Sequence, residues 1–210
     1  MNIIAIECSQ PRASLCLSLA GNVCAQASWH TERNHDAHLF PALEKALSEL
    51  GDEPLDMVLV GAGPGSYGGV RVALAAAVGI ATVKGARVVA IGSWDDLAAD
   101  GALIISDARR GGWALRRGSG EIVVLTPDEL HAELAGGSTV YTVESEEVMR
   151  KHNLSVAKAG LVPSAEGLIR SWKALTPAAQ EELAAKPAEP LYVRPPHITA
   201  AKHKPWEIRS

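Results

Sequence analysis

Residues 61–84 read GAGPGSYGGVRVALAAAVGIATVK, and this stretch decides the fold. The apolar run 57–60 before it is typical of a buried strand, and the glycines and proline of 63–69 then force a turn. Ser66 is suited to N-cap a helix over residues 70–84. We therefore expect a strand, a glycine-rich turn and a helix in direct succession.

The expected helix 70–84 is apolar on all sides, because no charged residue lies between Arg71 and Lys84. Such a helix is buried on more than one side. One side covers its own sheet, and the other is covered either by the rest of the chain or by another protein. The uncharged run is shorter than the roughly twenty residues of a membrane span, so we expect no membrane association.

The glycine-rich turn also raises the possibility of an anion site. A strand, a glycine-rich turn and a helix N-terminus together can bind a phosphate group. However, the stretch lacks both the Lys-Ser/Thr ending of a P-loop and the G-x-G-x-x-G spacing. The turn alone is therefore a weak indication of phosphate binding.

Composition narrows the class of protein. The chain has 210 residues, 47% of them hydrophobic and 21% charged, which is enough for one large or two small domains with a full core. Its net charge of −4 excludes a broad basic face for nucleic acid. The three cysteines contain no C-x-x-C pair, and residues 1–9 do not resemble a signal peptide, so we expect a cytoplasmic protein.

The order of expected elements indicates the fold class. Three strands, a helix, a strand, a helix, a strand and a helix form the half domain of ribonuclease-H-like proteins, shared by actin, Hsp70 and sugar kinases. By apolar pattern these elements are 1–6, 13–19, 23–29, 39–50, 57–60, 70–84, 87–91 and 93–99.

The pattern partly recurs in the second half of the chain. There we expect strands at 102–106, 113–117, 121–125 and 139–143, and helices at 127–134, 165–172 and 177–185. We therefore predict an α/β protein of two ribonuclease-H-like (actin/Hsp70-like) half domains, the second degenerate. The expected boundary at Asp100-Gly101 gives domains 1–100 and 101–210, the latter with a tail rich in proline and basic residues from Lys186.

The sequence also contains candidate ligands for a metal ion. His35 and His38, with Asp36 between them, could offer ligands near a helix start. No further ligand is evident, and exposed histidines at a helix start are common. We expect no metal and no cofactor.

The chain resembles the TsaB family, also called YeaZ, over nearly its whole length. The glycine-rich block is the most specific match, with Tyr67, Gly68 and Val70 as its changes from Gly-Pro-Gly-Ser-Phe-Thr-Gly-Leu-Arg. The matching blocks are Ile6 to Ser9, His35 to Pro41, Gly63 to Arg71, Asp107 to Arg109 and Pro190 to Arg194. Two departures are Glu7 in place of aspartate and Gly111-Gly112 where a glutamate is expected.

The resemblance implies a non-catalytic scaffold or activator subunit of the bacterial complex that makes N6-threonylcarbamoyladenosine next to the tRNA anticodon. The implied partners are a TsaD-like catalytic subunit and a TsaE-like ATPase, with a homodimer when the chain is isolated. Contact with tRNA is expected only through the complex. Pairing in the family uses the two helices of the first half domain, here 39–50 and 70–84.

Two sets of candidate residues follow. If Val70, Leu74 and Val78 face the sheet, the outer side carries the pairing residues. The pairing candidates are Leu39, Leu43, Leu47, Gly69, Ala73, Ala76 and Ile80. The alternative function, an actin-like ATPase or phosphotransferase with the Gly63 to Gly69 turn as phosphate cradle, would use Glu7, Ser9, Gly63, Gly65 and Ser66. A metallopeptidase is a third hypothesis, which lacks a metal site; we expect no catalytic residue.

Overall fold

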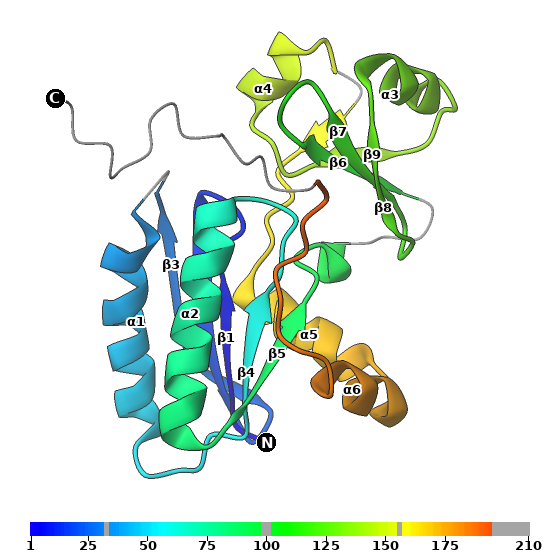
Figure 1. The fold of residues 1–210 in the computed structure, drawn as a ribbon. Coiled ribbons are helices and arrows are strands. Elements are labelled where there is room, and N and C mark those ends of the chain that lie inside the picture. Colours follow the sequence, from blue (N-terminus) through cyan, green and yellow to red (C-terminus); the bar gives the residue numbers. More distant parts are fainter. Residues whose placement is uncertain (32–33, 98–101, 155–156, 195–210) are drawn as a thin grey trace, which may run out of the picture.

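The structure, a computed structural model, describes residues 1–31, 34–97, 102–154 and 157–194. It contains two five-stranded sheets (Figure 1). The first sheet has the order β3-β2-β1-β4-β5, with β1 antiparallel to β2 and parallel to β4. Its strands are β1 (Ile3–Glu7), β2 (Arg12–Leu19), β3 (Asn22–His30), β4 (Met57–Gly61) and β5 (Arg87–Ile91).

The second sheet repeats this order as β8-β7-β6-β9-β10, with β6 as the counterpart of β1. Its strands are β6 (Leu103–Asp107), β7 (Trp113–Arg117), β8 (Ile122–Leu125), β9 (Val140–Thr142) and β10 (Ala157–Ala159). Helices α3 (Pro127–Leu134) and α4 (Glu146–Lys151) fill the same connections as the helices of the first half. The predicted fold class of two ribonuclease-H-like half domains is thus confirmed. The second half is degenerate in the length of its elements, not in their order.

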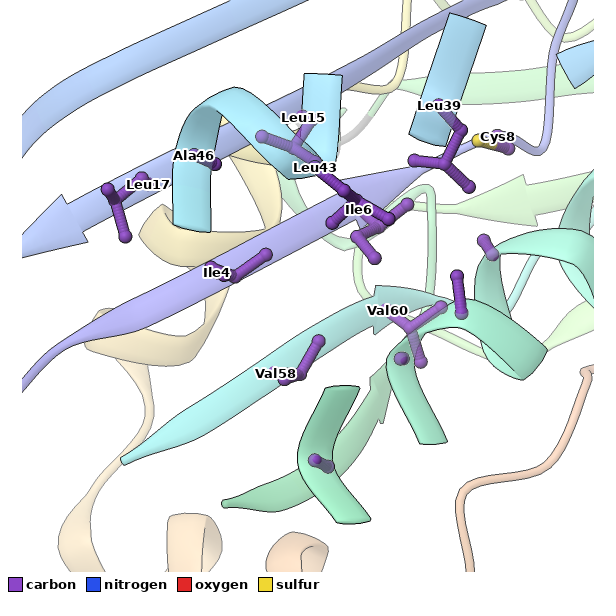
Figure 2. Close-up of a cluster of buried hydrophobic side chains, with 14 of the residues drawn as sticks. Ile4, Ile6, Cys8, Leu15, Leu17, Leu39, Leu43, Ala46, Val58 and Val60 are labelled. Carbon is purple, nitrogen blue, oxygen red and sulfur yellow. The ribbon is translucent and has the colours of Figure 1, made fainter. Parts of the chain in front are cut away.

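Helices α1 (His35–Leu50) and α2 (Tyr67–Lys84) lie side by side on one face of the first sheet (Figure 1). Leu39 and Leu43 of α1 pack against Ile6 of β1 in the main hydrophobic core (Figure 2). Alternate residues of β1 point to opposite faces, so Ile4 and Ile6 belong to this core while Ile3 and Ala5 belong to the core behind the sheet.

The opposite face of the first sheet is covered by α5 (Ala165–Ala174) and α6 (Pro177–Ala184). Leu168, Ile169 and Trp172 are buried against β1, β4 and β5. We expected both helices in the second half domain, so a division into 1–100 and 101–210 does not describe their packing. The physical reason is that the first sheet is apolar on both faces and needs a second layer. The expected boundary itself, Asp100-Gly101, lies outside the described residues.

The predicted N-cap of α2 and its predicted end at Lys84 are confirmed, but the helix begins at Tyr67, earlier than the predicted start at Val70. The side chain of Ser66 accepts a hydrogen bond from the Gly69 amide, and Gly85 adopts the left-handed conformation at the C-terminus with φ of 68°. By length and composition α2 could cross a membrane, but it packs on β1, β4 and β5 as a core helix.

The two halves are joined through the segment after β5. Trp94 is fully buried in a cluster with Ile104 and Ala114 of the second sheet. Asp95 starts the short 3-10 helix η1 (Asp95–Leu97) and accepts a hydrogen bond from Arg116 of β7 at 2.6 Å. The helix predicted over 93–99 begins at Asp95 and is a 3-10 helix through Leu97, and residues 98 and 99 lie outside the described residues.

Candidate functional site

A cleft of about 720 Å³ separates the two half domains. Its first wall comes from the β1-β2 turn and the glycine-rich turn, including Ser9, Arg12, Gly65 and Ser66. The opposite wall comes from the ends of β6 and β9. Three predicted nucleotide-site residues, Ser9, Gly65 and Ser66, thus lie together on the cleft.

Glu7 does not face this cleft. Its side chain is fully buried behind the glycine-rich turn, and its Oε1 accepts a hydrogen bond from the Ser9 amide at 2.6 Å. Burial raises the pKa of Glu7 above its usual value, and hydrogen bonds with Ser9 and Ser93 only partly oppose this shift. A raised pKa favours the neutral acid in the folded state, so Glu7 is poorly suited to hold a metal-nucleotide.

The raised pKa of Glu7 makes the stability of the chain depend on pH. Below the ordinary value of 4.5 both folded and unfolded chains carry the proton, and the stabilisation is lost as pH rises toward the folded pKa. We therefore expect Glu7→Gln to stabilise the chain, relative to wild type, more at pH 8 than at pH 5. Glutamine keeps an acceptor oxygen for Ser9 and carries no charge.

Urea unfolding of both proteins at the two pH values measures this effect. Each unit by which the folded pKa exceeds 4.5 is worth about 1.4 kcal/mol. Glu121→Gln is the matched control, because Glu121 is exposed and water solvates it in both states. An equal difference between wild type and Glu7→Gln at pH 5 and pH 8 would contradict the buried-acid interpretation.

Three amides of the glycine-rich turn are hydrogen-bonded within the chain. The Ser66 amide donates to the Ser9 carbonyl at 2.6 Å, and the Gly63 amide donates to the Ser93 hydroxyl at 3.0 Å. The Gly69 amide donates to the Ser66 hydroxyl at 3.2 Å. These bonds fasten the start of α2 to the segment after β1, and they leave fewer amides free for a phosphate cradle.

The opposite wall carries a polar cluster at the ends of β6 and β9. Glu144 Oε1 accepts hydrogen bonds from the Ser106 hydroxyl at 2.7 Å and the Asp107 amide at 3.0 Å. Asp107 in turn accepts from the Arg109 amide at 2.7 Å. Asp107 and Arg109 belong to a block that the sequence singles out, but Glu144 was missed, because its partners Ser106 and Asp107 are distant in sequence and meet it only in the folded chain.

His35 and His38 make different contacts. His35 is buried at the start of α1, where burial lowers its pKa and so favours the neutral ring. His38 stacks on Trp29 of β3, with 6.4 Å between ring centroids. Among the residues that the structure describes, no group of three histidine, cysteine, aspartate or glutamate side chains could hold a metal ion.

The predicted pairing residues are mostly internal, which corrects the expected orientation of α2. Leu39, Leu43, Gly69, Ala73 and Ala76 are buried in the chain's own core, and Leu47 and Ile80 are half-buried. The reason is close packing: a Cβ on Gly69 would overlap the Cys8 carbonyl, so small residues face the sheet. Because α2 is apolar all round, its sequence periodicity could not show this.

The outer faces of α1 and α2 nevertheless carry exposed apolar side chains. Phe40 is 56% exposed and Val83 is 83% exposed. On α2, helical spacing aligns Val83 with the exposed Ala75 and Gly79 and with Val72, which is half-buried and also packs against the core. We call Phe40, Val72, Ala75, Gly79 and Val83 the outer apolar face. No described element covers α1 and α2 on this side in Figure 1.

Comparisons with known proteins identify the relatives of this chain. The family model of TsaD, described as tRNA N6-adenosine threonylcarbamoyltransferase, matches residues 23–126. The tRNA threonylcarbamoyladenosine biosynthesis protein TsaB of Bacillus subtilis is 34% identical over 119 residues. That match covers 53% of this chain and 52% of the relative, so it spans about half the length of each protein.

Two solved structures from Pseudomonas aeruginosa share the fold. An uncharacterized protein with similarity to peptidase YEAZ has a TM-score of 0.69 and 23% identity, over 92% of this chain and 99% of its own. The structure of YeaZ has a TM-score of 0.65 and 22% identity, over 91% and 99%.

The repeated half domains and the cleft between them define an α/β protein of the actin-like class. Within that class, the chain is similar to the TsaB/YeaZ proteins in sequence over about half of its length and in fold over nearly all of it.

Proposed function

We propose that this chain is a non-catalytic subunit in the biosynthesis of N6-threonylcarbamoyladenosine in tRNA, and that it pairs with a TsaD-like catalytic subunit. The family relationship supports the pathway, because the curated relative is named for it. We place the protein in the cytoplasm, where tRNA is modified. A TsaE-like ATPase and self-pairing of the isolated chain belong to the same proposal.

The observation that carries the non-catalytic role is the state of the glycine-rich turn. Three of its amides bond to Ser9, Ser66 and Ser93, and the acid behind it, Glu7, is buried with a raised pKa. The outer apolar face supports pairing. Exposed apolar residues on two adjacent helices are consistent with a protein-protein interface.

The alternative function is an actin-like ATPase or phosphotransferase. The cleft of about 720 Å³ between the half domains favours it, because the nucleotide of this superfamily lies between two such halves. The occupied amides and the buried Glu7 disfavour it. Steady ATP hydrolysis by the chain alone, lost in Glu7→Gln, would establish the alternative.

Depletion of the protein tests the proposed pathway. We expect N6-threonylcarbamoyladenosine in bulk tRNA to fall several-fold, measured by mass spectrometry of digested tRNA. Re-expression of wild type should restore it, and so should Glu7→Gln, because that change preserves the fold and removes only an ionisable group. Unchanged levels of the modified base after depletion would reject the pathway for this chain.

A further inference from the structure

A second, smaller hollow of about 220 Å³ lies beside the glycine-rich turn. Three segments that are distant in sequence form it: the turn itself, the turn 107–112, and the C-terminal segment 190–194. The Leu191 amide donates to the Ala62 carbonyl at 2.8 Å, and Arg194 donates to the Arg109 carbonyl at 3.0 Å. The last described residues of the chain therefore tie the two half domains together at this hollow.

Two tyrosine rings stand at the hollow. Tyr67 and Tyr192 lie with their ring centroids 5.4 Å apart, and they are 51% and 46% exposed. The guanidinium of Arg71 lies 5.0 Å from the centroid of the Tyr67 ring. Exposed aromatic faces next to arginine are the platforms on which proteins stack nucleic-acid bases.

The charge at the hollow is positive although the chain as a whole is negative. Its described lining includes Arg109, Arg110 and Arg194 and no carboxylate. Asp107 lies 3.6 Å from Arg109 and offsets one of these charges. In a chain with a net charge of −4, this concentration of arginine indicates an anionic ligand.

The backbone of the two adjacent arginines is unusual. Arg109 and Arg110 both have positive φ, 63° and 53°, in the left-handed region that residues with a Cβ rarely adopt. Glycine or asparagine would adopt this turn with less strain. Strain of this kind is typical of functional sites, which supports a role for the two side chains themselves.

We propose that this hollow binds an unpaired nucleotide of single-stranded RNA. The base stacks on the tyrosines over the apolar floor formed by Ala62, Pro64 and Leu191, and the neighbouring phosphates lie against the arginines. RNA fits better than a free nucleotide, because Arg71 on α2 extends the positive charge beyond the hollow to more than one phosphate. The proposal of RNA binding follows from the hollow itself. The identification of this RNA as tRNA rests on the proposed function.

Fluorescence anisotropy of a labelled oligouridylate with the full chain tests the proposal. We expect Tyr192→Ala to weaken binding about tenfold, because one stacked base contributes about 1–3 kcal/mol. Tyr192→Phe keeps the ring and should bind as wild type does. Arg110→Glu and Arg71→Glu should each weaken binding and make it less dependent on salt concentration.

Arg150→Glu on α4 is the matched control, since it makes the same charge change at an exposed position away from the hollow. Thermal melts confirm that each variant is folded. The proposal is overturned if the chain does not bind the RNA, or if Arg150→Glu weakens binding as much as Arg110→Glu. It is also overturned if free uridine monophosphate displaces the labelled RNA as effectively as the unlabelled oligonucleotide does, at equal concentration of binding sites. Because binding is measured on the chain alone, this result is independent of the depletion experiment.

Discussion

Gly69→Ala is expected to destabilise the chain by more than about 3 kcal/mol, because it forces two parts of the backbone apart. A Cβ at position 69 would overlap the carbonyl oxygen of Cys8, and it would approach the His35 ring to 3.2 Å. A flexible side chain could move aside, but the Cys8 carbonyl belongs to the backbone that follows β1. Urea unfolding should show the loss as a lower midpoint or as failure to fold.

Gly79→Ala is the control for this change within the same helix. A Cβ on Gly79 meets nothing within 4 Å, so the variant should gain helix propensity. We expect it to stabilise the chain by roughly 0.5–1 kcal/mol. If both alanine variants are as stable as wild type, α2 does not pack against the β1-β2 turn.

The strand-turn-helix unit was predictable because its signals are local. Ser66 caps α2 and Gly85 ends it, each through a hydrogen bond or a dihedral angle that its own residue type favours. The order of elements in the first half followed from apolar patterns in the same way. Pro127 likewise marked the first turn of α3, where the Thr126 capping box is formed.

Most features that the sequence did not predict are formed by contacts between residues far apart in the chain. The packing of α5 on the first sheet, through Trp172 and Leu168, unites residues far apart in sequence and has no local signal. β10 has only three residues, too few to show a period. The charge cluster at the small hollow could not be predicted, because Arg109 and Arg194 meet only in three dimensions.

The predicted orientation of α2 was wrong for a different reason. A helix with apolar residues on every side has no preferred face in its sequence, so the contact made by Gly69 decides it. One step along the helix turns a side chain by about 100°, which separates Ala75 from Ala76. Ala76 is 8% exposed and faces the core, whereas Ala75 lies on the outer apolar face.

Ala75→Arg should abolish pairing with the TsaD-like subunit and leave the free chain folded. Arginine at this exposed position is solvated in the free chain, but in a helix-helix interface it would be a buried charge without a partner. We expect affinity to fall at least about 100-fold, as for a central interface residue. Titration calorimetry with the co-purified partner measures the affinity, and sedimentation measures self-pairing.

Two further variants distinguish a lost interface from a lost fold or a general effect of added charge. Ala132→Arg makes the same change at an exposed position of α3 in the second half domain, so it should pair as wild type does. Ala76→Arg should unfold the chain, because it places the charge in the core between α2 and the sheet. If Ala75→Arg still pairs with wild-type affinity, the partner does not bind the outer apolar face. If Ala75→Arg unfolds while Ala76→Arg remains stable, α2 has the reverse orientation, with Ala75 toward the sheet and Ala76 toward water.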